Sequence, residues 1–577
     1  MKAKELSHLW QLLLPLQRRS AVALLGLMMV GAGLDTVGVG LALPVIAVLA
    51  GAETSGLLPA GFQDWLAGHD RSTLIVAGVL LLLFAFLLKA IYRMGLTWQQ
   101  NRYAFQVQWS MSNRLFAAYM QRPWSFHLQR NSVSLVQGVT QEVDQFTFGV
   151  VVQSLVFMSE VFVIVALGTL LLSIEPVGGL VVVVMLGIVG YGFHRLTDAR
   201  ADGLASERRR IDRMRFRVLQ QGFGGVKEAR LLHREGEFLR QFAQAGERSA
   251  RIGRNVQTLR DLPRLWIEVL AIAGLTLLVV VMTMRGRSTE TIMPVAGLFA
   301  VAVFRLVPSV SRILTAAHAV GLSIGSVQSL RAELGVADVC HSEVTCDGPA
   351  DWDRIEIEHI NFSYSGQPAL VLDDVSLSIS RGQAVGLIGA SGSGKSTLVD
   401  VLIGLLSPSS GRVLVGGADI ATCMAWWQRR IGYVSQSIYL LDDSVRRNIA
   451  FGIAEDRIDE AAMTRAIKLA HLDDFIAGLP DGLATVVGER GVRISGGQRQ
   501  RIGIARALYH DPDVLVLDEA TSALDGDTES IVMEAIDALH GSKTIVVIAH
   551  RAATVARCDR VLRVVAGQVQ EQSTAHG

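Results

Sequence analysis

Six long apolar segments in the first 320 residues constrain the fold of this chain more than any other feature. They lie at about 20–50, 73–95, 147–173, 177–194, 263–284 and 290–320. A helix needs about 20 mostly apolar residues to cross a hydrocarbon core of about 30 Å, and each segment reaches that range. No small-residue cleavage site follows the first segment, so we interpret it as a membrane span and not as a signal peptide. Residues 1–335 are therefore expected to form an α-helical transmembrane domain with six spans.

Two arginine-rich connections between the spans indicate the orientation. Five arginines and no acidic residue occur between positions 93 and 141, and eight arginines occur between positions 195 and 217. Basic residues in connecting segments gather on the cytoplasmic side of a membrane. Both connections, and with them both chain termini, are expected in the cytoplasm.

The same connections are too long to be simple loops. If the second and third spans each continue as helix for about 25 residues, they project about 35 to 40 Å into the cytosol. Each extension is expected to turn through a short segment that docks on another domain, near 123–128 and near 212–221. Trp124 and Phe126 favour such a docking surface at the first turn, and packing between the helical extensions is the alternative.

Two shorter segments are amphipathic. Residues 4–17 contain one apolar helical face, which suits either a helix on the inner membrane surface or a core helix; its members are Leu6, Leu9, Trp10, Leu13 and Leu14. Residues 57–67 form one apolar face in the same way, which suits a short helix at the outer interface or a plain loop.

Charged residues interrupt the apolar segments, and charge inside a membrane requires an explanation. Arg312 follows Arg305 by seven residues, so the two lie on one helix face. Together with Lys89 they could line a polar cavity and attract an anionic substrate. Ion pairing between helices, or snorkelling to the interface, is the alternative. The charged residues in or near the spans are Asp35, Lys89, Glu160, Glu268, Arg305 and Arg312.

Residues 336–577 have the pattern of a soluble α/β domain. After a polar linker, residues 354–358 and 375–379 alternate apolar and polar side chains and are expected to pair in an antiparallel edge layer. The net charge of +1 gives no argument for a nucleic-acid partner. The four cysteines have neither metal-site nor disulfide-framework spacing, which favours reduced thiols in the cytosol.

A phosphate-binding loop lies in this second domain. GASGSGKST, at 389–397, fits G-x-x-x-x-G-K-[ST] and is flanked by the apolar runs that a strand and a helix require. The glycines let backbone N–H groups point at the phosphates of a nucleotide. Lys395 is expected to reach the β- and γ-phosphates, and Ser396 to hold Mg²⁺. The predicted cofactors are thus ATP and Mg²⁺, with nucleotide contacts from Gly389, Ser391, Gly392, Ser393, Gly394, Lys395, Ser396 and Thr397.

Further polar residues follow apolar strands downstream of the loop. The run 514–517 ends at Asp518, which can bind Mg²⁺, and at Glu519, which can polarise a water for attack on the γ-phosphate. Gln436 ends another strand and can supply an oxygen to Mg²⁺ or to the water. His550 ends a third strand and can donate to the γ-phosphate.

Two more features complete this set. The segment Ser495–Gln498 begins a helix whose N-terminus can bind the phosphate of a nucleotide on another copy. Tyr364 could stack on an adenine ring or belong to the core. Each motif alone has a simpler explanation as a turn, a cap or a satisfied histidine, but their order and spacing together favour a nucleotide site.

With these motifs in place, residues 336–577 resemble the ATP-binding cassette (ABC) family, and the whole chain looks like an exporter-type half-transporter. The resemblance assigns the A-loop aromatic to Tyr364, Walker A to 389–397, Walker B to 514–518 and the catalytic glutamate to Glu519. Gly488–Gly491 is similar to the X-loop, and Ile494 stands where the family usually has Leu. The remaining assignments are the Q-loop at Gln436, the signature at Ser495, Gly496, Gly497 and Gln498, the D-loop at Ser522–Asp525 and the H-loop at His550.

This resemblance implies a mechanism and a location. ATP hydrolysis would drive alternating access in a multi-pass protein of the bacterial inner membrane, with the nucleotide-binding domain in the cytoplasm. Because no motif is degenerate, two copies would make two competent sites, which favours a homodimer. No nucleic-acid partner is implied.

Four segments are similar to flippases of lipid-linked oligosaccharides used in bacterial protein N-glycosylation: Phe304–Pro308, Gly225–Leu232, Gln436–Asp443 and 57–67. That likeness implies that Lys89, Arg260, Arg305 and Arg312 attract a pyrophosphate while the lipid tail stays partly in the bilayer. Two alternatives remain, a homodimeric exporter of lipids or amphipathic drugs and an ATP-gated channel or regulatory membrane protein. The spans exclude a soluble cassette ATPase of the DNA-repair kind.

Overall fold

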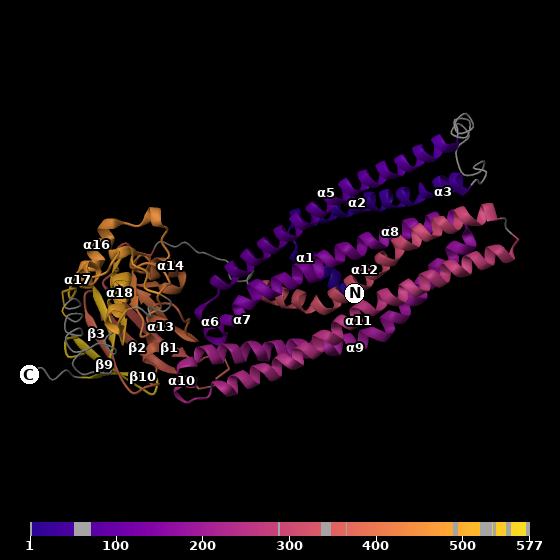
Figure 1. The fold of residues 1–577 in the computed structure, drawn as a ribbon. Helices are drawn as coiled ribbons and strands as arrows, with labels where there is room; N and C mark the ends of the chain where they lie inside the picture. Colours follow the sequence, from indigo (N-terminus) through magenta and orange to yellow (C-terminus); the bar gives the residue numbers. More distant parts are fainter. Residues whose placement is uncertain are drawn as a thin grey trace, which may run out of the picture. The chain divides into compact units, whose positions relative to one another are not determined.

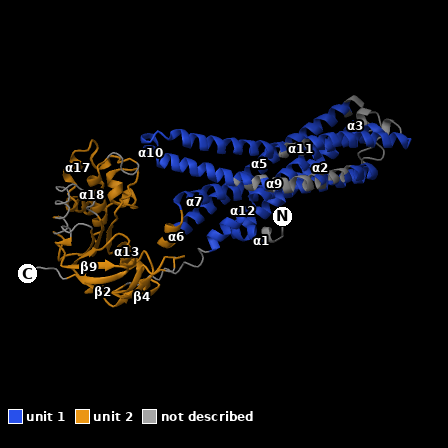
Figure 2. Cartoon of the chain, turned by 90° about the horizontal axis from the view of Figure 1, so that it is seen from below, with its two compact units in different colours: residues 1–121, 131–340 blue, residues 122–130, 341–577 orange. Residues whose placement is uncertain are grey.

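The computed structural model of the chain forms two compact units. It describes residues 3–50, 71–286, 289–335, 348–364, 366–367, 369–488, 494–519, 534, 538–549 and 555–572. One unit comprises residues 1–121 and 131–340, and the other comprises residues 122–130 and 341–577 (Figure 2). The sequence-predicted boundary at 335/336 borders residues outside the description and stays a prediction.

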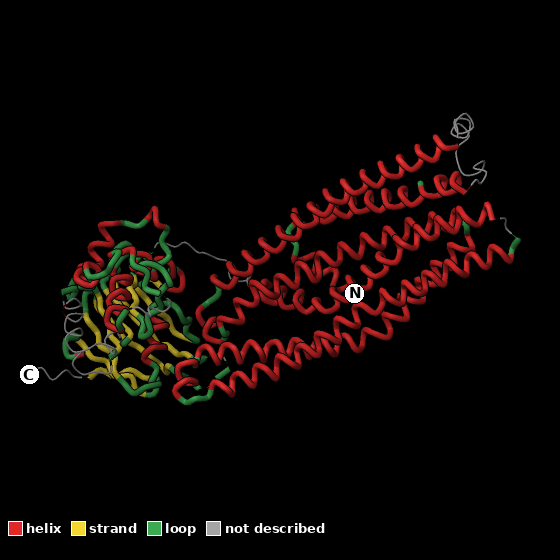
Figure 3. The backbone as a smooth tube through the Cα atoms, in the orientation of Figure 1, coloured by secondary structure: helices red, strands yellow, loops and turns green. Residues whose placement is uncertain are grey.

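The first unit is built of long helices (Figures 1 and 3). Its apolar segments must be helical in a membrane, because a helix satisfies its own backbone hydrogen bonds where no water is present. Proline begins α2 and α9, where the missing N–H costs nothing. The helices are α1 (Ala3–Leu12), α2 (Pro15–Gly40), α3 (Ala42–Ala50), α5 (Arg71–Met120), α7 (Ser132–Gln137), α8 (Val152–Ile174), α9 (Pro176–Gly224), α10 (Val226–Leu231), α11 (Glu235–Met284) and α12 (Thr289–Gly335), with π-helical turns at Gly138–Glu142 and Gln145–Val151.

The predicted transmembrane helical domain is confirmed as the fold of this unit. Among the described residues, five helical stretches are long and apolar enough to cross a membrane: Pro15–Ile46, Ile75–Met120, Ser132–Ile174, Leu265–Met284 and Ile292–Gly335. The remaining predicted span, 177–194, lies in α9, where many side chains are outside the description. The amphipathic segment 57–67 also lies outside the described residues.

The first helical extension and its turn lie where the sequence predicts them, but the second turn does not. Helix α5 runs from the expected end of its span at 95 to Met120. The chain then turns through the short helix α6 (Trp124–Gln129), which groups with the second unit. The expected second turn at 212–221 is wrong, because that stretch is still inside α9. The helix continues until Gly224–Gly225, where the glycines end it and α10 forms the turn.

The core of the first unit is apolar and lies between helices. Leu167, Leu171, Leu298 and Ala302 are fully buried where α8 and α12 pack, together with residues of α2, α3 and α11. Helix α5 instead exposes leucine and phenylalanine side chains along much of its length, including Leu83 and Phe84. Such a surface suits contact with lipid.

The second unit is an α/β domain with two sheets. The antiparallel sheet has the order β2-β1-β4-β5, and β1 pairs with β2, as predicted for 354–358 and 375–379. The larger sheet has the order β10-β9-β3-β8-β7-β6, with parallel pairing from β9 through β6. The strands are β1 (Arg354–Phe362), β2 (Leu372–Ser380), β3 (Ala384–Ile388), β4 (Ser410–Val415), β5 (Ala418–Asp419), β6 (Ile431–Val434), β7 (Val514–Asp518), β8 (Thr544–Ile548), β9 (Arg560–Val565) and β10 (Gln568–Gln572).

Helices cover the larger sheet because its central strands are apolar on both faces. Strands β7 and β8 are almost fully buried. The helices of this unit, besides α6, are α13 (Lys395–Leu402), α14 (Met424–Gln428), α15 (Val445–Ile449), α16 (Glu460–Leu469), α17 (Asp473–Ala477) and α18 (Gly496–Leu508). Parallel pairing brings the carboxyl ends of β3, β6, β7 and β8 to one edge, which is where ligands bind in such sheets.

Asn448, in α15, orders the segment between β6 and α16. Its side chain is fully buried, accepts from the backbone N–H of Leu441 at 2.8 Å and donates to the carbonyls of Leu441 and Ser444. Arg506 of α18 donates from Nη2 to the Asn448 Oδ1 at 3.2 Å and from Nε to its backbone carbonyl at 2.8 Å. The segment that begins at Gln436 is thereby tied to the helix that begins after Ser495.

We predict that Asn448→Ala destabilises the second unit by about 2 to 4 kcal/mol, because several buried backbone groups lose their partners at once. Hydrogen exchange of the amides at 441–450 should accelerate, and the thermal transition should fall. Asn101→Ala, at an exposed position of α5, is the matched control and should change neither. Unaltered exchange at 441–450 would show that other contacts order the segment.

Candidate functional site: a nucleotide loop and an intramembrane charge cluster

The loop at 389–397 joins β3 to α13 and depends on glycine. Gly392 and Gly394 have φ of +77° and +106°, values that disfavour any side chain. A Cβ at Gly394 would lie 2.9 Å from the Val371 carbonyl oxygen, and one at Gly389 would lie 2.3 Å from the Val564 carbonyl oxygen. The chain is thus packed too closely here for other residues, and the backbone curls around the start of α13.

Lys395 and Ser393 lie inside this loop. The Lys395 side chain is buried, and its Nζ donates to the carbonyl oxygens of Gly389 and Ala390 at 2.9 Å each. Ser393 Oγ is buried without a hydrogen-bond partner. The Lys395 ammonium group and the Ser393 hydroxyl can both donate hydrogen bonds to the oxygens of a polyphosphate. Ser391, Gly392 and Ser396 are exposed and so remain accessible.

Tyr364 lies beside the same loop. Its hydroxyl is 3.0 Å from Thr397 Oγ1, and its ring packs edge-to-face on Phe362 with centroids 5.0 Å apart. The position is compatible with both interpretations of this aromatic, because the ring packs against the core and stands next to the loop.

Gln436 and Glu519 are brought together by the parallel sheet. The Gln436 Nε2 donates to Glu519 Oε2 at 2.6 Å. Glu519 follows β7 with a φ of +49°, which is strained for a residue with a side chain. Its N–H donates to the Ile548 carbonyl oxygen of β8 at 3.1 Å. The strand end therefore sets the direction of this carboxylate.

Asp518 lies near a second carboxyl group, that of Asp400. Tyr433 donates from its hydroxyl to Asp518 Oδ2 at 3.3 Å. Burial, and then the charge of Asp518, raise the pKa of Asp400 in α13 to about 6. The Tyr433 pKa is raised as well, by burial and by both carboxylates, so its hydroxyl stays a donor. Sequence reasoning missed Asp400 and Tyr433, although Asp400 is only five residues beyond Lys395.

These residues fit a Mg²⁺ ion. Ser396, Gln436 and Asp518 offer only oxygen ligands to a cation, which is the donor type that Mg²⁺ prefers. Burial and the nearby charge of Asp518 raise the pKa of Asp400, so a cation bound between these two half-buried carboxyl groups would be stabilised by both.

We predict that Asp400→Asn raises the stability of the metal-free protein at pH 7.5. The folded-state pKa is raised, so the protonated form stabilises the fold below about pH 4, and that contribution is lost as the pH rises through 6. Removing the charge should contribute on the order of 1 to 2 kcal/mol at pH 7.5, after a discount for the partial exposure of Asp400, and roughly a third of that at pH 4.5. Thermal unfolding in EDTA at both pH values measures this, and an equal shift at both would contradict it.

Ser495 caps α18. Its Oγ accepts from the N–H of Gln498 at 3.2 Å, and the Gln498 Oε1 accepts from the N–H of Ser495 at 2.8 Å. Gly496 and Gly497 form the first turn with no side chains to cover the N-terminal amides. Within the helix, the capping box provides an acceptor for the N–H of Gln498. Other N–H groups of the first turn can therefore donate to an anion. His550, Ser522–Asp525 and residues 489–491 lie outside the described residues.

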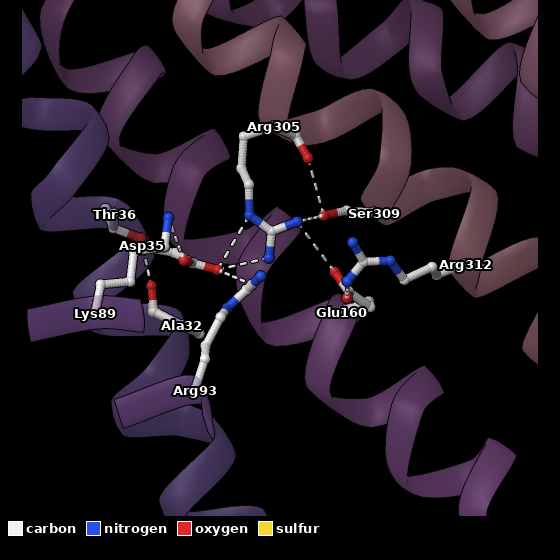
Figure 4. A network of polar contacts seen from close by, with 9 residues as sticks. All are labelled: Ala32, Asp35, Thr36, Lys89, Arg93, Glu160, Arg305, Ser309 and Arg312. Atoms are coloured by element: carbon white, nitrogen blue, oxygen red, sulfur yellow. Dashed lines mark hydrogen bonds and ion pairs between the residues drawn. The ribbon is translucent and has the colours of Figure 1, made fainter. Parts of the chain in front are cut away.

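A cluster of charged side chains lies among the helices of the first unit (Figure 4). Asp35 of α2 is 1% exposed and pairs with Lys89 and Arg93 of α5 at 2.7 Å each. Arg305 of α12 lies 2.5 Å from the same carboxylate and 3.7 Å from Glu160 of α8. Arg312 pairs with Glu160 at 2.5 Å.

The structure therefore brings Lys89, Arg305 and Arg312 together, as the cavity interpretation requires, but pairs each with a carboxylate, as the ion-pair alternative requires. Arg93 was not among the predicted site residues, because it was counted with the cytoplasmic arginines. Its spacing of four from Lys89 was the available signal. The side chain of Arg260 is outside the description, and Glu268 is exposed on α11.

Comparison with known proteins identifies both units. A family model described as the ABC transporter transmembrane region matches residues 32–305, and one described as ABC transporter matches residues 372–522. The chain belongs to the ABC transporter family. Its general activity is thus ATP hydrolysis coupled to transport, and its first unit makes it a multi-pass membrane protein.

Similar proteins further describe this ABC transporter. It is 28% identical over 541 residues to the ATP-dependent lipid A-core flippase of Ralstonia nicotianae, covering 92% of this chain and 90% of that protein. It is 41% identical over 222 residues to a putative multidrug export protein of Staphylococcus aureus, covering 38% of each. The structure of a bacterial Atm1-family ABC exporter with ATP bound covers 96% of this chain and 94% of its own, with a TM-score of 0.78 and 22% identity. The fold is therefore that of an ABC exporter.

Proposed function

We propose that this ABC exporter works as a homodimer and flips a lipid whose headgroup carries phosphate, such as a lipid-linked oligosaccharide. The observation that carries the proposal is the charge cluster, in which Lys89, Arg93, Arg305 and Arg312 converge inside the apolar unit. Charge is retained within membrane spans mainly where it serves a substrate or ion pathway. The likeness to a lipid A-core flippase along most of both chains supports a lipid cargo.

The nucleotide would bind between two copies. Lys395 and the loop amides of one copy would hold the β- and γ-phosphates, with Tyr364 at the adenine, while Ser495–Gln498 of the second copy would cap the γ-phosphate. Ser396, Gln436 and Asp518 would hold Mg²⁺, which neutralises phosphate charge. Glu519 would polarise the attacking water, with His550 at the γ-phosphate. In this arrangement both termini and the second unit lie in the cytoplasm of a bacterium.

A drug exporter is the second candidate, favoured by the likeness to the multidrug export protein. It predicts ATPase stimulation by neutral apolar compounds and no dependence on Arg305. A channel or regulatory role predicts activity that persists without hydrolysis, and the complete set of catalytic residues, including Glu519, argues against it.

We predict that Glu519→Gln retains ATP binding and lowers turnover by roughly 100-fold or more, because the amide cannot take a proton from the water. The glutamine keeps an oxygen that can accept from Gln436, so the site should stay folded. Steady-state hydrolysis and nucleotide-binding titration check this. Glu460→Gln, an exposed carboxylate, is the control, and near-normal turnover by Glu519→Gln would remove the assignment.

The substrate is tested in vesicles of reconstituted full-length protein. We expect ATP-dependent movement of a pyrophosphate-linked polyprenyl oligosaccharide and none of a neutral lipid of similar chain length. Arg305→Ala should reduce that movement at least roughly 10-fold while sparing basal hydrolysis, since one charged contact to a phosphate contributes about 1.4 kcal/mol or more. Undiminished flipping by Arg305→Ala would remove the anion site.

A further inference from the structure

The charge cluster contains more positive than negative charge. Two carboxylates, Asp35 and Glu160, face four cations, which leaves a net charge of +2. The cations come from α5 and α12, and the carboxylates come from α2 and α8, so the ion pairs join four helices (Figure 4). Among the described residues, no further acid pairs with these four cations.

Such a surplus is costly where little water reaches. Lys89 and Arg305 are only 15% and 12% exposed, whereas Arg93 and Arg312 are partly in reach of water, and three cations crowd the single carboxylate of Asp35. Cations held this closely repel one another, and burial weakens the hydration that would offset the repulsion. The arrangement is therefore stabilised by any group that brings two negative charges.

The carboxylates also use their oxygens incompletely. Glu160 Oε2 is buried without a hydrogen bond, and Arg305 Nη1 reaches it only at 3.7 Å because that group donates to Ser309 Oγ at 2.8 Å. Asp35 Oδ1 lies 2.7 Å from Lys89 Nζ but without hydrogen-bond alignment. A phosphate has more acceptor oxygens than a carboxylate and can receive donors from several guanidinium groups at once.

We propose that Asp35 and Glu160 are exchangeable counter-ions, which hold the four cations in the empty transporter and give them up to the phosphate of the substrate. This inference rests on the proposed function and deepens it. A headgroup with two or more negative charges takes over Arg305 and its neighbours, and the net charge of +2 favours it over a neutral headgroup. The carboxylates re-form their pairs when the headgroup leaves. By competing for the cations, the two carboxylates weaken headgroup binding and speed headgroup release.

The exchange also changes which helices are joined. In the present pairing Asp35 ties α2 to α12, and Glu160 ties α8 to α12. A phosphate held by both Arg305 and Arg312 releases both ties, so headgroup binding removes the charged links of α12 to two of its neighbours. Asp35 and Glu160 act here as specificity-determining residues for the headgroup, not as catalytic residues.

The test measures binding of farnesyl pyrophosphate, with farnesol as the neutral ligand of the same chain, to full-length protein in detergent. All proteins carry Lys395→Ala, so that the nucleotide loop does not bind the pyrophosphate. We expect Asp35→Asn and Glu160→Gln each to tighten pyrophosphate binding about 10-fold and to leave farnesol binding unchanged. In vesicles, with Lys395 intact, the same substitutions should lower both the KM and the kcat of transport, because release slows.

Two further variants separate exchange from other effects. Asp35→Asn with Lys89→Met restores the net charge of +2 without the competing carboxylate, and it should still bind more tightly than the parent. If Asp35→Asn alone fails to fold, the double variant still tests the proposal, because its cluster has the same net charge as the parent. Asp212→Asn, which removes a carboxylate from an ion pair on the α9 extension, should change nothing.

The outcomes are distinct. Unchanged or weaker pyrophosphate binding in folded Asp35→Asn, Glu160→Gln and the double variant would overturn the exchange, since the carboxylates would then be structural partners only. Equal tightening of farnesol would also overturn it, because the effect would not depend on charge. If the parent protein moves only neutral lipids in vesicles, the proposed function fails instead.

Discussion

The ion pairs around Asp35 are the interaction on which the membrane unit depends. A lone carboxylate in an apolar helix bundle is expensive, and so is a lone arginine, but each becomes tolerable when the other is within hydrogen-bond reach. Asp35 meets three cations and Glu160 meets two, and these contacts join α2, α5, α8 and α12. Apolar packing of α8 and α12 also holds these helices together, and the ion pairs add specific partners to that contact.

The two units carry opposite electrostatic surpluses. In the membrane unit, cations outnumber carboxylates around Arg305. In the ATP-binding unit, burial and then the nearby charge of Asp518 raise the pKa of Asp400 to about 6. Each surplus has the sign opposite to the group that the proposed function brings to it, phosphate in one case and Mg²⁺ in the other. Sites that bind charged groups reversibly are commonly left unbalanced without them, because a fully balanced site would have nothing to gain on binding.

Sequence patterns predicted most of the fold because long apolar runs and the phosphate loop have few structural solutions. The stretch 354–379 gave the antiparallel layer, and the run 514–517 gave a buried strand with Glu519 at its end. The second turn between the helical extensions was misplaced because arginine and glutamine at 212–221 are good helix formers, and the helix ends only at Gly224–Gly225.

The partners of individual charges could not be predicted. Charged residues inside spans were recognised singly, but pairing across helices depends on rotation of each helix about its axis, which periodicity does not fix. Asp35 and Arg305 are 270 residues apart, and Arg93 was counted with the cytoplasmic residues although it points to the same carboxylate. Asp400 likewise shows its importance only when the sheet places it near Asp518.

Pro308 weakens helix α12 in the turn that carries Arg305. Pro308 has no N–H to donate, so the carbonyl of Phe304 loses its usual partner one turn earlier. Ser309 is fully buried, donates from Oγ to the Arg305 carbonyl and accepts from the Arg305 guanidinium. The second contact stiffens this turn through the same guanidinium that would bind a headgroup. When Arg305 turns to another anion, that reinforcement is lost together with the tie to Asp35. A change of ligand at one guanidinium therefore alters both the neighbours of α12 and its resistance to bending, which is the kind of local switch that alternating access requires.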